Sequence, residues 1–214
     1  MALVLHGYRY SVYRRIAGLA LVEKGVGYER VEVNPFAPDL SAAYLAMNPF
    51  GRVPTLVHDG FALYETCAIT RYIDRAFPGP RLQPETPKSL ARMDQIIAVV
   101  DAYAYWPLVR QVFSHAVFRP RLGGPTDAQE IARGLAAAPR VLGALESLAS
   151  DDAFLVGPSL SLADLHLGAM IAYFARAAEG AALLGSYPRL AAWWRRLQSR
   201  ESFAVTDPGL PAKP

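Results

Sequence analysis

The stretch Asn48–Asp74, NPFGRVPTLVHDGFALYETCAITRYID, decides the fold of this 214-residue chain. It predicts a strand, a tight turn at Asp59-Gly60, a second strand and a helix that begins at Glu65-Thr66, because an Asp-Gly pair between apolar runs is a strong hairpin signal. The Val53-Pro54 bond can be cis, and a helix start presents backbone N–H groups that bind anions. The stretch therefore predicts an extended backbone edge beside an anion cradle, which suits a peptide with a free carboxylate.

Hydrophobic periodicity extends this pattern in both directions along the chain. It predicts strands over 3–6, 28–33, 53–58 and 61–63, and helices over 12–24, 41–47 and 65–77. This order, βαβαββα, indicates a mixed sheet with helices packed on it.

A run rich in proline and glycine, Phe77–Pro87, is the clearest composition break in the chain and predicts a linker. We therefore expect one domain over 1–78, a linker over 79–87 and a second domain over 88–214. No convincing strand follows the break, and Pro107 is expected to kink or end the first helix after it. The predicted helices of the second domain cover 88–118, 127–149, 162–178 and 188–200.

The composition narrows the class of protein. Apolar residues make up 52% of the chain and charged residues 19%, which favours a well-filled core. The net charge is +3 without any run of five basic residues, so we expect no nucleic-acid partner. The single cysteine, Cys67, excludes a disulfide within the chain and favours a reducing compartment. Neither a signal peptide nor a long apolar run is visible, so a cytoplasmic protein without a membrane partner is expected.

Three motifs resemble those of the soluble glutathione transferases. They are NPFGRVPTL at 48–56, the run YETCAI at 64–69, which is similar to the E-S-x-A-I motif of the family, and GPSLSLAD at 157–164, which is similar to its G-x-S-x-S-x-A-D capping motif. The resemblance covers nearly the whole chain and mixes features of the phi, tau and bacterial members. It implies a thioredoxin-like N-terminal α/β domain, an all-helical C-terminal domain and a dimeric cytoplasmic detoxification enzyme that conjugates glutathione to small hydrophobic electrophiles.

The resemblance also assigns a glutathione site. Val53, before the cis Pro54, is expected to pair with the cysteinyl unit of glutathione as an added strand does. Glu65 and Thr66 are expected to hold its γ-glutamyl end, although an ordinary helix cap is the alternative. Arg52 could face the glycyl carboxylate. In the phi class a histidine usually does so from before the second helix, whereas Asp39 and Leu40 stand there in this chain.

A hydroxyl after the first strand is expected to stabilise the glutathione thiolate, because a thiol with a pKa near 8.5 is only slightly ionised at neutral pH. Serine-type and cysteine-type members resemble (S/C)-P-F-x-x-R-x-R-x-x-L-x-E-K-G, and counting back from Glu23-Lys24-Gly25 reaches Ser11. Ser11 can also be a simple N-cap, and Val12 stands where the motif has proline. Tyr8 and Tyr10 are the alternatives, as in the tyrosine-type classes.

The remaining assignments concern the second half of the chain. In the family the region after Asp101 forms the wall of the electrophile pocket, for which Tyr10, Trp106, Phe113 and Tyr173 are the candidates. Ser161 and Asp164 read as a capping box with a structural role. The histidines lack metal-ligand spacing, so no metal is expected. Cys67, in the first turn of a helix, is expected to be a buried small side chain, and Phe50 is a candidate for the dimer contact.

Two other functions stay open at this point. One is a glutathione-dependent peroxidase or thiol-exchange enzyme. The absence of cysteine at position 11 argues against the exchange activity. The other is a non-catalytic protein of the same fold that binds glutathione or another ligand.

Overall fold

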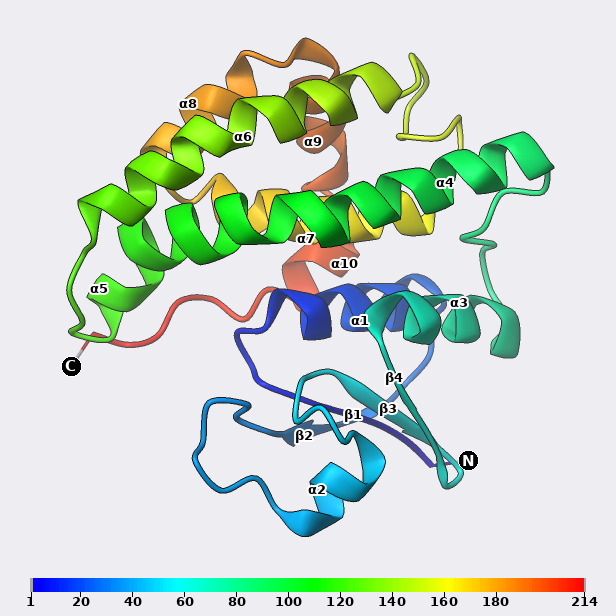
Figure 1. Ribbon diagram of the computed structural model, residues 1–214. Coiled ribbons are helices and arrows are strands. Elements are labelled where there is room, and N and C mark those ends of the chain that lie inside the picture. The colour runs from blue at the N-terminus through cyan, green and yellow to red at the C-terminus, as the bar shows by residue number, and fades with distance from the viewer. Residues whose placement is uncertain (1, 214) are drawn as a thin grey trace. The chain divides into compact units, whose positions relative to one another are not determined.

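The structure, a computed structural model, describes residues 2–213 and divides them into two compact units (Figure 1). The first comprises residues 2–82 together with the segment Val205–Pro208, and the second comprises 83–204 and 209–213. The division after Leu82 falls inside the predicted linker. Each unit is described by itself.

The first unit is built on a four-stranded mixed sheet. Its strands are β1 (Leu3–Gly7), β2 (Glu29–Glu32), β3 (Thr55–His58) and β4 (Phe61–Tyr64), in the order β2-β1-β3-β4. β1 runs parallel to β2 and antiparallel to β3, and the hairpin of β3 and β4 closes through Asp59-Gly60, where both residues have a positive φ. The predicted hairpin and the βαβαββα order are confirmed.

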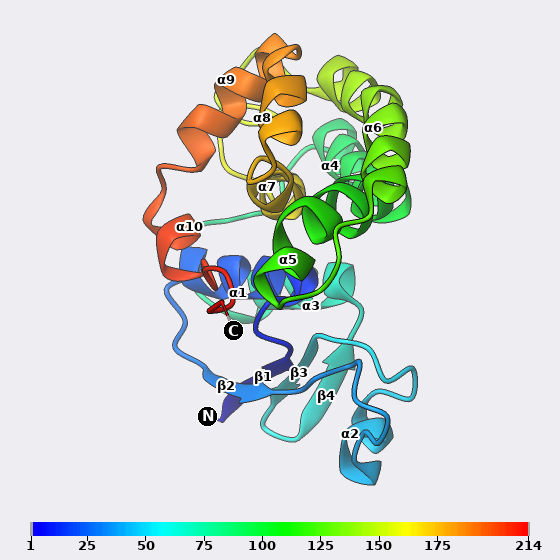
Figure 2. The same ribbon diagram turned by 90° about the vertical axis from the view of Figure 1, so that its left-hand side faces the viewer.

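Three helices complete this unit: α1 (Val12–Glu23), α2 (Ala42–Met47) and α3 (Thr66–Ala76). α1 and α3 lie side by side on one face of the sheet, and α2 lies on the opposite side (Figures 1 and 2). Apolar side chains such as Ile16, Leu19, Ile69 and Ile73 are fully buried in this layer. This burial, rather than local propensity, supplies most of the stability of such short helices.

A buried ion pair fixes the chain that leaves this unit. Lys24 Nζ donates to Asp74 Oδ1 at 3.1 Å and to the Pro80 carbonyl at 3.0 Å, while Leu82 N donates to the same Asp74 Oδ1 at 2.8 Å. Gly79 has φ +110 and lies so close to the Lys24 carbonyl that a Cβ there would be 2.8 Å from its oxygen. The first residues of the predicted linker are therefore tied to α1 and α3.

All secondary-structure elements named in the second unit are helices. Its helices are α4 (Pro87–Val99), η1 (Val100–Phe118), α5 (Arg119–Arg121), α6 (Ala128–Leu148), α7 (Leu162–Phe174), α8 (Ala178–Gly185), α9 (Pro188–Leu197) and α10 (Glu201–Val205), of which the last residue belongs to the first unit. α7 is buried on almost all sides, as expected for a helix that is apolar all round, and Figure 2 shows it at the centre of this bundle. None of the described helices is long and apolar enough to cross a bilayer.

The helical segment predicted over 88–118 is present as α4 and η1. Of the two outcomes expected at Pro107, an end of the helix is excluded, because η1, which has the wide turns of a π-helix, continues through this residue to Phe118. One prediction about these helices was wrong. The helix predicted over 162–178 ends at Phe174, and a separate helix, α8, follows. Gly180 permits this tight junction, since a Cβ there would collide with the Phe174 carbonyl.

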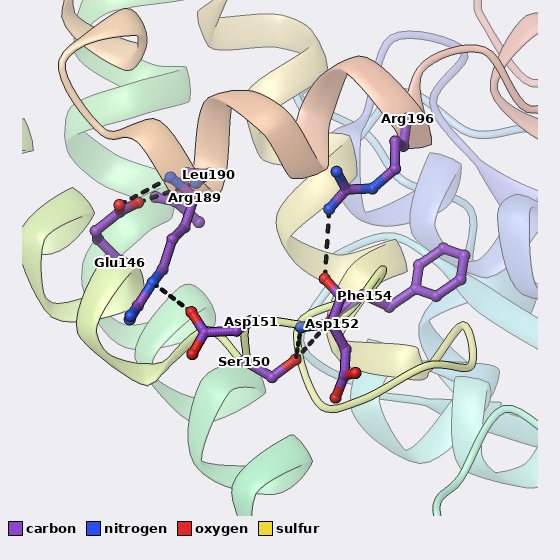
Figure 3. A network of polar contacts seen from close by, with 8 residues as sticks. All are labelled: Glu146, Ser150, Asp151, Asp152, Phe154, Arg189, Leu190 and Arg196. Carbon is purple, nitrogen blue, oxygen red and sulfur yellow. Dashed lines mark hydrogen bonds and ion pairs between the residues drawn. The ribbon is translucent and has the colours of Figure 1, made fainter.

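The start of α9 is capped by a side chain from another helix. Glu146 of α6 accepts hydrogen bonds from the backbone N–H groups of Arg189 and Leu190, both at 2.9 Å (Figure 3). The negative carboxylate also suits the positive end of the helix dipole. Nearby, Arg189 forms an ion pair with Asp151 at 3.0 Å. The polar groups at this helix start are satisfied within the protein.

Candidate active site

The register of the sheet brings three predicted site segments to one edge. His6 of β1 pairs with Thr55 of β3, and Thr55 pairs with Tyr64 of β4. The chain after β1, the chain before β3 and the chain after β4 therefore leave the sheet side by side. Neighbouring strands lie about 4.8 Å apart, so the three segments span roughly 10 Å. The loop that carries Ser11, the cis-proline edge and the start of α3 meet here.

The peptide bond between Val53 and Pro54 is cis, as predicted. The carbonyl of Arg52, the residue before Val53, accepts hydrogen bonds from the Tyr44 hydroxyl and from Asn48 Nδ2. The same two side chains also bond to Thr55 Oγ1, at 3.0 and 3.2 Å, beyond the proline. Tyr44 and Asn48 are 3% exposed and Thr55 is fully buried. The cluster thus holds both ends of the segment that contains the cis bond.

This cluster determines the direction of a backbone donor. The bond between Arg52 and Val53 is trans, so its N–H group points opposite to its carbonyl. Because the carbonyl is directed at Tyr44 and Asn48, the Val53 N–H is directed away from them. It is thereby placed to pair with an extended peptide laid along this edge.

The start of α3 is strained and is not capped by its own N-cap residue. Glu65 has φ +68 and ψ 113, a conformation that costs a residue with a side chain about 1–3 kcal/mol. Its side chain makes no capping hydrogen bond, contrary to the ordinary-cap alternative. Thr66 is 8% exposed. The N–H groups of the first turn therefore keep the anion-binding capacity of a helix N-terminus.

Cys67, in that first turn, is half-buried rather than buried, so this prediction was wrong. Apolar periodicity assigned it to the inner face, whereas Ile69, Thr70 and Ile73 are the residues of this helix with no exposed surface.

Ser11 is the N-cap residue of α1. Its Oγ accepts a hydrogen bond from Arg14 N at 3.3 Å, and its own N–H donates to the Tyr8 carbonyl at 2.9 Å. In the capping bond the hydroxyl is an acceptor, so that bond does not use the hydroxyl proton. The N-cap interpretation and the thiolate-donor interpretation are therefore compatible at this residue.

Tyr8 lies in an aromatic cluster with Tyr10 and Phe36, at ring-centroid distances of 5.6 and 5.9 Å. Burial raises the pKa of Tyr8 above its ordinary value, and the Tyr10 phenol and the Glu32 carboxylate raise it further. A less acidic phenol is a weaker hydrogen-bond donor to a thiolate.

Sequence reasoning missed Tyr44 and Asn48 as supports of the site. Asn48 begins the motif NPFGRVPTL, and its Oδ1 accepts from Phe50 N at 3.2 Å, so an asparagine before proline was an available signal. Tyr44 had no such signal, because it lies inside a predicted helix. Arg52, in contrast, is exposed, in agreement with a side chain directed away from this cluster.

The aromatic candidates of the helical unit lie in different environments. Phe113 and Tyr173 are buried and contact one another edge to face, with centroids 4.8 Å apart. Trp106 is 59% exposed, with the Arg110 guanidinium 6.0 Å from its ring centre. Within this unit, the structure brings Phe113 and Tyr173 together and leaves Trp106 on the surface.

The predicted capping box is present at the start of α7. The Asp164 carboxylate is fully buried and accepts from Leu155 N, Ser161 N, Ser161 Oγ and Trp193 Nε1, at 2.6–2.8 Å. Burial raises the pKa of Asp164, and these hydrogen bonds oppose the rise. Asp164 thus joins the loop before α7, the helix itself and α9.

The fold and the site define a thioredoxin-like domain with a cis-proline edge, joined in one chain to an all-helical unit. Comparisons with known proteins agree with this class. The family models for the N-terminal and C-terminal domains of glutathione S-transferase match residues 5–81 and 105–201.

Similar proteins match along most or all of the chain. Glutathione S-transferase F13 of Arabidopsis thaliana is 33% identical over the whole chain and 99% of its own length, and glutathione S-transferase 1 of Zea mays is 34% identical over 86% of the chain and 85% of its length. Among solved structures, apo glutathione S-transferase III has a TM-score of 0.85 at 29% identity, covering 100% of this chain and 99% of its own. Glutathione S-transferase I bound with lactoylglutathione has a TM-score of 0.83 at 29% identity, covering 96% and 98%. The chain belongs to the glutathione S-transferase family and is an enzyme of that kind.

Proposed function

We propose that this enzyme binds glutathione along the edge at Val53-Pro54 and transfers it to small hydrophobic electrophiles. The backbone of Val53 pairs with the cysteinyl unit, and the first turn of α3 with the Thr66 hydroxyl binds the γ-glutamyl carboxylate. Glu65 faces the ammonium of the same unit. The observation that supports this proposal is the register of the sheet, in which the chain after β1, the chain before β3 and the chain after β4 leave the sheet side by side.

Ser11 then activates the thiol. Its hydroxyl donates a hydrogen bond to the sulfur and lowers the thiol pKa, and the positive end of the α1 dipole stabilises the thiolate further. A pKa shift of two units requires roughly 2.7 kcal/mol of preferential thiolate stabilisation. The thiolate attacks the electrophile, for which Tyr10, Trp106, Phe113 and Tyr173 remain the proposed pocket residues. Arg52 is the proposed partner of the glycyl carboxylate.

We further propose that the enzyme is a cytoplasmic homodimer with a role in detoxification. An exposed aromatic side chain in the first unit supports a contact with a second copy: Phe50 is 67% exposed, and its ring lies 5.9 Å from that of the half-buried Tyr64. Large apolar side chains on the surface commonly mark such contacts. Analytical ultracentrifugation of the chain and of Phe50→Ser tests this, with a dimer expected for the former and weaker association for the latter.

Calorimetric titration with glutathione, followed by turnover of a chlorinated dinitrobenzene and of an organic hydroperoxide, tests the function. We expect saturable binding and rapid conjugation. Binding without conjugation of the aromatic chloride would replace the proposal by a binding protein, and turnover of the hydroperoxide alone would replace it by a peroxidase.

A further inference from the structure

The segment Val205–Pro208 belongs to the first unit, although it lies far from the rest of that unit in sequence. Two arginines near the start of α1 contact neighbouring residues of this segment. Arg9 Nη2 donates to the Pro208 carbonyl at 3.3 Å, and Arg15 Nη2 lies 4.0 Å from Asp207 Oδ2. The segment is therefore held on both sides of the position at which α1 begins.

Ser11 lies between these arginines in sequence and shares a face of α1 with one of them. Residues i, i+4 and i+7 of a helix lie on one face, and these positions are Ser11, Arg15 and Gly18. A Cβ at Gly18 would lie 3.8 Å from Thr206 Cγ2, so the segment follows this face. Arg15 N donates to the Ser11 carbonyl at 3.0 Å. Because helical side chains lean toward the N-terminus, the Arg15 side chain extends toward Ser11.

The first turn of α1 carries an unusual charge. It contains no acidic residue, whereas Arg14 and Arg15 both lie close to its beginning. The positive end of a helix dipole normally favours carboxylates and is destabilised by cations. Arg15 is only 5% exposed, so water and salt screen its charge poorly. The helix dipole and a buried cation thus both add to the positive potential around its N-cap residue.

Two carboxylates from other segments oppose this positive potential. Glu32, at the end of β2, accepts a hydrogen bond from Arg9 N at 2.8 Å. Asp207 forms the ion pair with Arg15, and its side chain is 36% exposed. Of the two, Asp207 is the one that faces the buried cation on the face of α1 that carries Ser11.

We propose that the ion pair of Arg15 and Asp207 sets the electrostatic potential at Ser11. The cation stabilises a thiolate held there, and the carboxylate reduces that stabilisation. The two members of the pair therefore have opposite effects on a thiol at this position. A pair that only held α1 in place would behave differently, because loss of either member would disturb Ser11 in the same direction. The effect on glutathione rests on the proposed function, whereas the potential at position 11 does not.

The variant Ser11→Cys, combined with Cys67→Ala to remove the other thiol, reports this potential without glutathione. The midpoint pH of its alkylation by iodoacetamide follows the ionisation of the new thiol. Adding Asp207→Asn should lower the midpoint by about half a pH unit and adding Arg15→Met should raise it as much, since a charge roughly 10 Å away has an effect of this size. Adding both should restore the midpoint. Glu29→Gln, an exposed carboxylate at the other end of β2, is the control and should leave it unchanged.

A higher midpoint in both single variants would overturn the proposal and leave the pair a structural role alone. An unchanged midpoint after Asp207→Asn would overturn it as well, and this variant decides the question if Arg15→Met does not fold. Arg15→Lys keeps the charge and should keep the midpoint of the reporter.

The thiolate absorbance of bound glutathione tests the step that depends on the proposed function. With Ser11 in place, we expect the thiol pKa to be lowest in Asp207→Asn, intermediate in the unmodified chain and highest in Arg15→Met. Normal glutathione binding without this order would overturn the effect of the pair on glutathione alone. Failure of the unmodified chain to bind glutathione would instead overturn the proposed function, while the alkylation midpoints still decide the potential at position 11.

Discussion

Helices α7 and α3 both begin at polar residues. The two helix starts differ in whether the side chains there form capping hydrogen bonds. At α7, Ser161 and Asp164 form a reciprocal cap, and the buried carboxylate accepts four hydrogen bonds from the protein. At α3, Glu65 is exposed, has φ +68 and makes no capping bond with its side chain. A helix start that is closed by its own chain stabilises the fold. One that is held in a strained, open form retains N–H groups for a ligand.

The largest effect is expected at the closed helix start. Asp164→Ala leaves buried donors of Leu155, Ser161 and Trp193 without their acceptor, which should lower the free energy of unfolding by about 4 kcal/mol, with each unmet buried group costing about 1–3 kcal/mol. Urea unfolding measures this. Asp152→Ala, an exposed carboxylate in the preceding loop, is the control and should unfold within about 0.5 kcal/mol of the unmodified chain. A loss of less than about 1 kcal/mol in Asp164→Ala would contradict the stabilising role assigned to the closed start of α7.

Asn48→Ala should have the next largest effect, because it removes hydrogen bonds on both sides of the cis bond. We expect about 2 kcal/mol less stability and a weaker affinity for glutathione, since the Val53 N–H is no longer fixed in direction. Asn48→Asp keeps the acceptor for Phe50 N but loses the amide donor, so it separates the two contributions. Full glutathione affinity in both variants would show that the cluster supports only the fold.

At the open helix start we expect effects on binding with little effect on folding. Glu65→Gln removes the charge that faces the ammonium and should weaken glutathione binding about tenfold, or 1.4 kcal/mol, with an unchanged unfolding midpoint. Isothermal titration calorimetry measures the affinity. A large loss of stability with intact binding would assign Glu65 the same role as Asp164.

Thr66→Val should give the smallest effect, because it removes a single hydroxyl and keeps the shape of the side chain. We expect an affinity for glutathione about fivefold lower, or about 1 kcal/mol. Thr66→Ser restores the hydroxyl and should restore the affinity. If the valine and serine variants bind equally well, the backbone N–H groups hold the carboxylate alone.

Local patterns were sufficient for most of the fold. The Asp59-Gly60 turn, the order of strands and helices along the first unit and the capping box all depend on residues close in sequence, and each is confirmed. The segment 175–177 was misread, because the close packing of Gly180 that separates α7 from α8 is a tertiary effect that periodicity does not report.

The site was predictable to the extent that its residues occur in motifs. The cis bond, the start of α3 and the position of Ser11 at the N-cap of α1 were all anticipated. The role of Tyr44 was not, because a tyrosine on a short helix carries no sign of the carbonyl it will meet. Helical spacing likewise could not distinguish the buried Phe113 from the exposed Trp106, since both follow the same periodic pattern.

The most direct test of the account is the ionisation of glutathione bound to Ser11 variants, followed as ultraviolet absorbance of the thiolate against pH. Ser11 combines the capped start of α7 with the open start of α3, because its hydroxyl oxygen caps α1 while its hydroxyl proton can be donated to a ligand. With the unmodified chain we predict a thiol pKa about two units below the free value of about 8.5, so that the thiolate predominates at neutral pH. Ser11→Ala should return the pKa toward the free value and lower kcat, and Ser11→Thr should preserve both. A thiol pKa in Ser11→Ala that stays as low as in the unmodified chain would contradict the account.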